Sequence, residues 1–322
     1  MEFIKRVFKF HKSKIVLFLI LIIAFAIVFF PYDDLSDLIT AEVANATGNT
    51  VHVQFDNLAL GFLPQPGIKM TNVFIETPFV SQLKVDELKV APSLLSVFVL
   101  KPLGRAIAEN LFGGSLDLSI SNSSKLKAPM ALSADLNYTN FDLNEVVKTL
   151  IPIPMKAHGR ASLTADIDFD AEFKSQPNGT VLLTSQSIAI PSFSFDANMN
   201  GVKQMMSIPA LNIGQLKLKG QFKDGKILFT DTVIGSAKDD IFAKIGGDID
   251  LKISAQPLSV TYYNLAIDLT LKDTFIKDLG SYSSMLDMML GKHKTKSLDG
   301  IRYAFRFQFN PNTDAFPLFA PY

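Results

Sequence analysis

The stretch SLTADIDFDAEF, residues 162–173, decides the fold class. Every second side chain in it is apolar, and those between are polar or acidic. Successive side chains of a β-strand point to opposite faces of its sheet, so a period of two is typical of an antiparallel strand with one apolar and one solvated face. The apolar set is Leu163, Ala165, Ile167, Phe169, Ala171 and Phe173, which alternate with Ser162, Thr164, Asp166, Asp168, Asp170 and Glu172.

The same period recurs along the chain, at residues 216–223, 241–253, 263–271 and 303–309. Tight turns are predicted at Pro177-Asn178-Gly179 and at Lys223-Asp224-Gly225-Lys226, because Asp-Gly is a strong hairpin signal. These patterns predict a mainly β protein built from antiparallel strands.

Helical patterns are few and short. They cover residues 32–47, 101–111, 143–150 and 281–290, and the third begins with Asp142 and Glu145 in a capping-box-like arrangement. None is long enough to cover a large sheet. The apolar strand faces must therefore pack on each other or line a binding surface.

An uninterrupted apolar run covers residues 15–30 and predicts a transmembrane helix. Five basic residues precede it and three aspartates follow it closely, so the positive-inside rule places the N-terminus in the cytoplasm. The predicted organisation is a cytoplasmic tail at 1–14, a signal anchor at 15–31 and a β-rich domain at 32–322 on the far side of the membrane. A cleaved signal peptide is the rival interpretation, but Phe29-Phe30-Pro31 lacks the small residues of a cleavage site.

The amino-acid composition excludes several classes of function. Positive and negative side chains balance at 31 each, which leaves no electrostatic footprint for nucleic acid. The chain has no cysteine, which excludes disulfides, thiolate metal sites and a cysteine nucleophile. Its 27 phenylalanines indicate either a thick β core or an exposed apolar surface.

No residue pattern predicts catalysis, a metal site or a cofactor. Asp166, Asp168 and Asp170 share a strand face, but a strand spaces them in a line, so a solvated face is the interpretation. The Ser-x-x-Lys match at 81–84 lies in an alternating segment, whereas that chemistry needs a helical turn. His52 is expected to be exposed, and the basic segment 292–296 is expected to be a solvated loop with some capacity to touch anionic head groups.

Several turn and strand motifs resemble those of AsmA-like proteins and of type II secretion system protein N. They are the segments 55–64, 67–73, 88–95, 111–116, 142–143, 159–163 and 298–300, and the proline tail at Phe316-Pro317. Asn310-Pro311-Asn312 departs from the pattern, where a glycine is expected. The resemblance implies an inner-membrane protein with an elongated, groove-forming periplasmic β domain.

Two functions follow from that resemblance. The first is a structural accessory of type II secretion whose partners are other secretion subunits, and the second is a lipid-binding or lipid-transporting groove. Which one applies depends on whether the apolar faces form a closed sandwich or an open trough, and the period of two is compatible with both. Candidate lipid-groove residues are Leu216, Leu218, Phe222, Tyr263, Leu265, Ile267, Tyr303, Phe305 and Phe307.

Overall fold

The computed structural model describes residues 32–61, 66–77, 80–93, 103–151, 154–172, 174–199, 202–252, 259–314 and 316–322, together with Phe18, Leu21 and Lys101. The predicted transmembrane segment at 15–31 thus falls outside the described residues, apart from Phe18 and Leu21. Within the described part, no helix has the length and apolar character needed to cross a bilayer.

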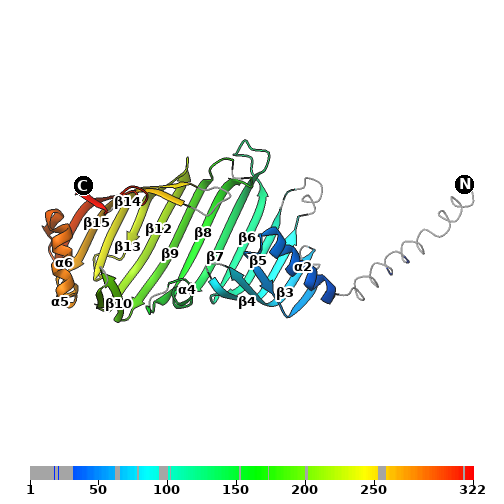
Figure 1. The fold of residues 1–322 in the computed structure, drawn as a ribbon, viewed down its shortest axis with the longest axis horizontal. Coiled ribbons are helices and arrows are strands. Elements are labelled where there is room, and N and C mark those ends of the chain that lie inside the picture. The colour runs from blue at the N-terminus through cyan, green and yellow to red at the C-terminus, as the bar shows by residue number, and fades with distance from the viewer. Residues whose placement is uncertain are drawn as a thin grey trace, which may run out of the picture.

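One antiparallel sheet of 16 strands dominates the structure, which confirms the mainly β prediction (Figure 1). Its order is β1-β3-β4-β5-β6-β7-β8-β9-β12-β13-β14-β15-β17-β16, so most neighbours in space are also neighbours in sequence; β2 also pairs with β3, and β18 with β17. The first strands are β1 (His52–Gln54), β2 (Asn57–Gly61), β3 (Gly67–Thr77), β4 (Val80–Pro92), β5 (Gly104–Leu111), β6 (Gly114–Asn122), β7 (Ala131–Asp142), β8 (His158–Asp170) and β9 (Asn178–Ile190). The remaining strands of this sheet are β12 (Leu211–Lys223), β13 (Lys226–Ile234), β14 (Ile241–Lys252), β15 (Ser259–Lys272), β16 (Lys294–Lys296), β17 (Gly300–Phe309) and β18 (Leu318–Pro321).

Short elements complete the described structure. A separate two-stranded hairpin lies between β9 and β12 in sequence and comprises β10 (Phe193–Met199) and β11 (Val202–Ile208). The helices are α2 (Tyr32–Ala46), α4 (Leu143–Leu150), α5 (Asp273–Asp278), α6 (Ser281–Leu290) and the 3-10 turn η1 (Gly291–His293). Helix α4 begins as predicted, because Asp142 Oδ1 accepts a hydrogen bond from the Asn144 N–H at 2.8 Å.

One predicted helix and one predicted turn are wrong. Residues 104–111 form strand β5 rather than a helix, because pairing with β4 and β6 outweighs the helix propensity of Ala106 and Ala108. No tight turn forms at Pro177-Asn178-Gly179, since β9 begins at Asn178. The turn at Asp224-Gly225 is as predicted, with both residues at positive φ (51° and 76°) between β12 and β13.

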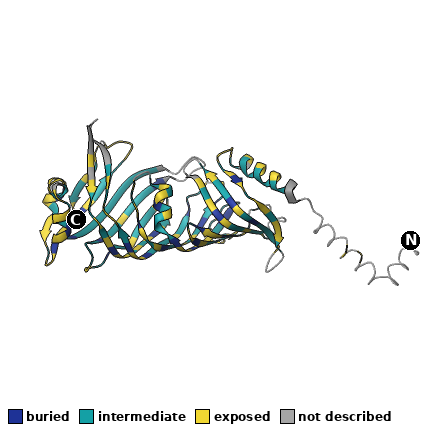
Figure 2. Cartoon of the chain, turned by 90° about the horizontal axis from the view of Figure 1, so that it is seen from below, coloured by how far each residue is buried: buried dark blue, intermediate teal, exposed yellow. Residues whose placement is uncertain are grey.

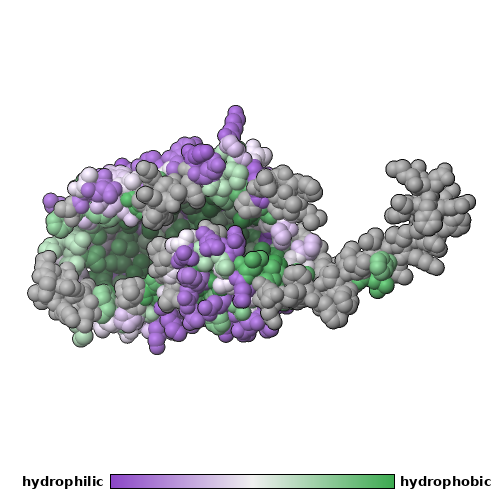
Figure 3. Space-filling model, turned by 45° about the vertical axis from the view of Figure 1, so that its right-hand side comes forward, coloured by the Kyte–Doolittle hydropathy of each residue, from purple (hydrophilic) through white to green (hydrophobic). Residues whose placement is uncertain are grey.

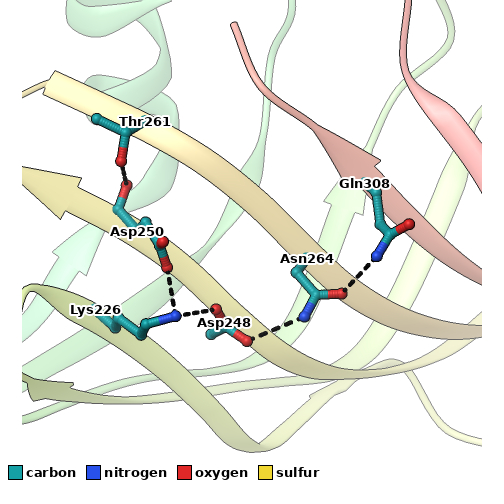
Figure 4. A network of polar contacts seen from close by, with 6 residues as sticks. All are labelled: Lys226, Asp248, Asp250, Thr261, Asn264 and Gln308. Atoms are coloured by element: carbon teal, nitrogen blue, oxygen red, sulfur yellow. Dashed lines mark hydrogen bonds and ion pairs between the residues drawn. The ribbon is translucent and has the colours of Figure 1, made fainter. Parts of the chain in front are cut away.

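The polar face of the sheet is connected across strands by charged and amide groups. Lys226 Nζ on β13 lies 3.2 Å from Asp248 Oδ2 and 2.9 Å from Asp250 Oδ1 on β14 (Figure 4). Asn264 donates to Asp248 at 3.2 Å, and Gln308 donates to Asn264 at 3.5 Å, so the network continues to β15 and β17. These polar side chains are satisfied by one another across the strands, so they need no second layer of protein to cover them.

Similar cross-strand ion pairs on β3 and β4, near the N-terminal end of the sheet, predict how the stability of the fold depends on pH. Glu87 lies 2.5 Å from Lys69 and 2.6 Å from Lys89, and the hydrogen bonds from these two lysines lower the pKa of its carboxyl group. A lowered pKa adds stability above the unfolded-state value of about 4.3, and that stability is lost as the pH falls through the folded-state pKa. Glu87→Gln is therefore expected to destabilise the fold at pH 7 by less than about 1 kcal/mol. Urea denaturation at pH 7 and pH 3 checks this, and an equal difference at both pH values would contradict it.

Candidate functional site: an apolar trough

The opposite face of the sheet carries a continuous row of apolar residues and glycines. Each residue of the row is the Cα partner of the next one on the neighbouring strand, and the row can be followed in this way from β2 at one edge to β18 at the other. Partners directly opposite each other in a sheet project from the same face, so the row forms one surface. This apolar row is Leu60, Ile68, Val90, Ala106, Leu118, Leu136, Ala165, Val181, Gly220, Phe229, Gly247, Leu265, Phe307 and Phe319.

A second row of the same kind runs beside it, two residues further along each strand. It crosses from β4 to β17 with the Tyr263 hydroxyl as its only polar side-chain group. Its members are Pro92, Gly104, Ile120, Ala134, Ile167, Gly179, Phe222, Ile227, Ile249, Tyr263 and Phe309. The two rows define what we call the apolar face.

Most of the apolar face is half-buried rather than buried. In the apolar row, Leu60 and Gly247 are exposed, Gly220 is buried and the rest are intermediate. Intermediate burial, drawn in teal, is common along the whole sheet (Figure 2). A closed sandwich would bury such residues between two sheets. Figure 3 instead shows a hollow lined by hydrophobic residues with hydrophilic residues around its rim. The apolar face therefore forms a trough.

Helices close the two ends of this trough. At the N-terminal end, Val43 of α2 and Val146 of α4 pack against a core cluster on β1 to β8 that contains Val73 and Val85. At the other end, Phe275 of α5 and Leu290 of α6 form a second core cluster with Tyr303. Between the two clusters lies an open stretch of apolar side chains that belong to neither: Val181, Leu216, Leu218, Phe222, Ile227, Phe229, Ile249, Tyr263 and Leu265.

All nine candidate lipid-groove residues project from the same side of the sheet as the apolar face, but in different surroundings. Five belong to the open stretch: Leu216, Leu218, Phe222, Tyr263 and Leu265. Ile267 and Phe307 lie at the margin of the C-terminal cluster. Tyr303 and Phe305 are only 2% and 5% exposed, so they are core residues beneath the end helices. Aromatic rings extend this margin, with Phe307 5.9 Å from Phe319 and 6.2 Å from Tyr263 between centroids.

Sequence reasoning missed part of the open stretch. Val181, Ile227 and Phe229 were not singled out, although each is an apolar residue on a strand. A weak signal was present in residues 226–229, where Ile227 and Phe229 are two positions apart. Their contribution depends on the register with Phe222, Gly220 and Gly247, which the sequence of one strand does not contain.

The acidic strand face departs from expectation. Asp166 is exposed as predicted, but Asp168 and Asp170 are buried. Ser123 donates to Asp168 at 2.7 Å and Lys125 Nζ lies 3.1 Å away, because residues 123–126 fold over this part of β8. Asp170 accepts hydrogen bonds from backbone N–H groups of the turn that follows it. No group of metal-ligating side chains occurs among the described residues.

The other residues considered in the sequence, at 81–84, 52 and 292–296, lie in regular secondary structure. Residues 81–84 lie in strand β4, as their alternation predicted, and His52 is exposed on β1. The basic segment 292–296 is not a loop, since η1 and the edge strand β16 contain it.

A depression of about 920 Å³ lies apart from the open stretch, against β4 to β8. Two of its charged lining residues pair with each other: Arg105 donates to Asp117 at 2.8 Å, and this contact lowers the pKa of the Asp117 carboxyl group. The apolar trough is therefore the stronger candidate site, because its surface has no partner within the described chain. Comparison of the chain with family models, with curated proteins and with solved structures finds no match.

Proposed function

We propose that this chain is a membrane-anchored lipid-binding protein whose trough holds acyl chains. The observation that supports the proposal most strongly is the open stretch, where two adjacent rows of half-buried apolar side chains cross several strands with the Tyr263 hydroxyl as their only polar group. Exposed apolar surface of this extent marks a binding site in most proteins.

The dimensions suit an acyl chain. Five inter-strand steps separate β9 from β17, which amounts to about 24 Å at about 4.8 Å per step. The hydrocarbon of one membrane leaflet is about 15 Å thick, half of the bilayer core. An extended acyl chain can therefore lie across the strands in full contact with apolar side chains.

An added peptide strand is a poorer fit than a lipid. A peptide would need a free sheet edge for its backbone hydrogen bonds. The outer edges of β3 and β17 are covered by β1, β2, β16 and β18, so the two ends of this sheet are formed by short strands of three to five residues, which offer an added strand few backbone partners. The surface that is left offers apolar contact without hydrogen-bond partners, which is what an acyl chain requires.

The proposal includes the localisation predicted from the sequence. Residues 15–31 would anchor the chain in the inner membrane, with residues 32–322 in the periplasm as an AsmA-like β domain beside a source of lipid. The role of accessory to type II secretion, with other secretion subunits as partners, remains a prediction from the resemblance. Neither function needs a catalytic residue, metal or cofactor.

Photo-crosslinking tests the proposal at residue level. The full chain is incubated with a phospholipid that carries a diazirine on one acyl chain, irradiated and mapped by tandem mass spectrometry. Labels are expected on Leu218, Phe222 and Leu265, because these side chains face the trough. Their neighbours Lys219 and Ala266 face the other side and should stay unlabelled. Absence of label, or equal label on both faces, would overturn the proposal.

A further inference from the structure

Exposed methionines gather at the C-terminal end of the molecule. Met205 on β11 is 72% exposed and Met288 on α6 is 81% exposed, and Met289 is exposed as well. Tyr282 of α6 links the two elements: its hydroxyl accepts from the Ser207 N–H at 3.2 Å and donates to the Met205 carbonyl at 3.4 Å. The exposed thioethers therefore belong to two elements that contact each other.

Two unpaired cations lie in the elements that directly follow α6, Lys292 in η1 and Lys296 at the end of β16. Lys292 and Lys296 are exposed, and neither ammonium group has an ion-pair partner among the described residues. Lys294, between them, pairs with Asp287 of α6 at 2.7 Å. That pair neutralises the carboxylate and holds β16 against the helix. We call Met205, Met288, Met289, Lys292 and Lys296 the Met–Lys surface.

We infer that the Met–Lys surface binds the face of an anionic lipid bilayer. Flexible thioether side chains can enter the boundary between head groups and acyl chains, while lysine ammonium groups meet lipid phosphates. A purely apolar protein groove would leave the two lysines without counter-charges, so charge complementarity favours the anionic bilayer.

The Met–Lys surface is separate from both the predicted membrane anchor and the apolar trough. It lies on α6 and the elements next to it, at the opposite end of the sheet from α2 (Figure 1). Its residues lie outside the open stretch of the trough. The inference thus goes beyond the proposed function and does not rest on it.

The expected effects are measurable. Each lysine near an anionic membrane surface raises affinity about fivefold, so removal of both should weaken binding about thirtyfold. Because the cations are exposed, 1 M salt, at which the screening length is about 3 Å, should weaken binding to a similar extent.

The test uses the full chain in nanodiscs of phosphatidylcholine, so that its apolar N-terminal run is already in a bilayer. These nanodiscs are mixed with vesicles of phosphatidylcholine containing one-third phosphatidylglycerol, and co-sedimentation is measured. Wild-type nanodiscs should bind these vesicles and not pure phosphatidylcholine vesicles. Lys292→Gln/Lys296→Gln should lose about thirtyfold in affinity, and Met205→Ser/Met288→Ser should also weaken binding.

The matched control is Lys127→Gln/Lys156→Gln, which removes the same charge from two exposed lysines elsewhere. It should bind like the wild type. No binding to phosphatidylglycerol vesicles, or equal loss in the test and control lysine variants, would overturn the inference. Crosslinking of acyl chains to Leu218 and Leu265 would be unaffected by that outcome, so the two proposals fail independently.

Discussion

Phe305→Ala is expected to lower the free energy of unfolding by about 3–5 kcal/mol, the usual cost of removing a buried phenylalanine ring. Phe305 is 5% exposed and belongs to the cluster that joins α5 and α6 to the sheet. Its ring lies 5.6 Å from Phe319 and 6.3 Å from His293, between centroids. Truncation leaves a cavity beneath the end helices, which cannot collapse without moving them.

The matched variant is Phe307→Ala, on the same strand and the same face but at the margin of the cluster. Because Phe307 is only half-buried, its truncation should cost clearly less. Urea denaturation followed by circular dichroism gives both values, and hydrogen exchange of the α5 and α6 amides locates the loss. Equal destabilisation by the two variants would show that the end helices do not protect Phe305 as the structure indicates.

The strands were predictable from sequence because their signal is local. The alternation at 162–173, 241–253 and 303–309 identifies β8, β14 and β17 and assigns each side chain to a face. Errors arose where the local signal was ambiguous. Ala106 and Ala108 suit a helix as well as a strand, and their pairing with β4 and β6 decides between the two.

The trough was only partly predictable, because it depends on what covers each strand. Tyr303, Phe305 and Phe307 alternate identically in sequence, yet the first two are core and the third is half-buried. The difference comes from the packing of Phe275 and Leu290, which lie on helices that the alternation of β17 does not specify. The choice between sandwich and trough likewise depends on the order of the strands in space. In this structure the strands join into one large sheet, and its apolar face has no second large sheet opposite it.

The buried aspartates illustrate the same limit. Asp168 alternates with apolar residues like the exposed Asp166, but the segment that folds over it brings Ser123 and Lys125 into contact. A strand pattern indicates which face a side chain is on. It does not indicate whether a distant loop covers that face.

The central claim, that the apolar trough holds acyl chains, is tested most directly by measuring the lipid bound to two variants at adjacent residues. Leu265 lies in the open stretch, and Ala266 follows it on the opposite face, directly across from Arg306. An aspartate at 265 places a charge against the acyl chain and should lower bound lipid at least about tenfold. An aspartate at 266 faces solvent and a cation, so it should leave bound lipid unchanged.

The measurement is native mass spectrometry and fatty-acid analysis of the full chain, released in mild detergent, for the wild type, Leu265→Asp and Ala266→Asp. Circular dichroism of all three confirms that the sheet is retained. We expect lipid on the wild type and on Ala266→Asp, and little on folded Leu265→Asp. A lipid-free wild type, or a folded Leu265→Asp with as much lipid as Ala266→Asp, would contradict the assignment of the apolar trough as an acyl-chain site.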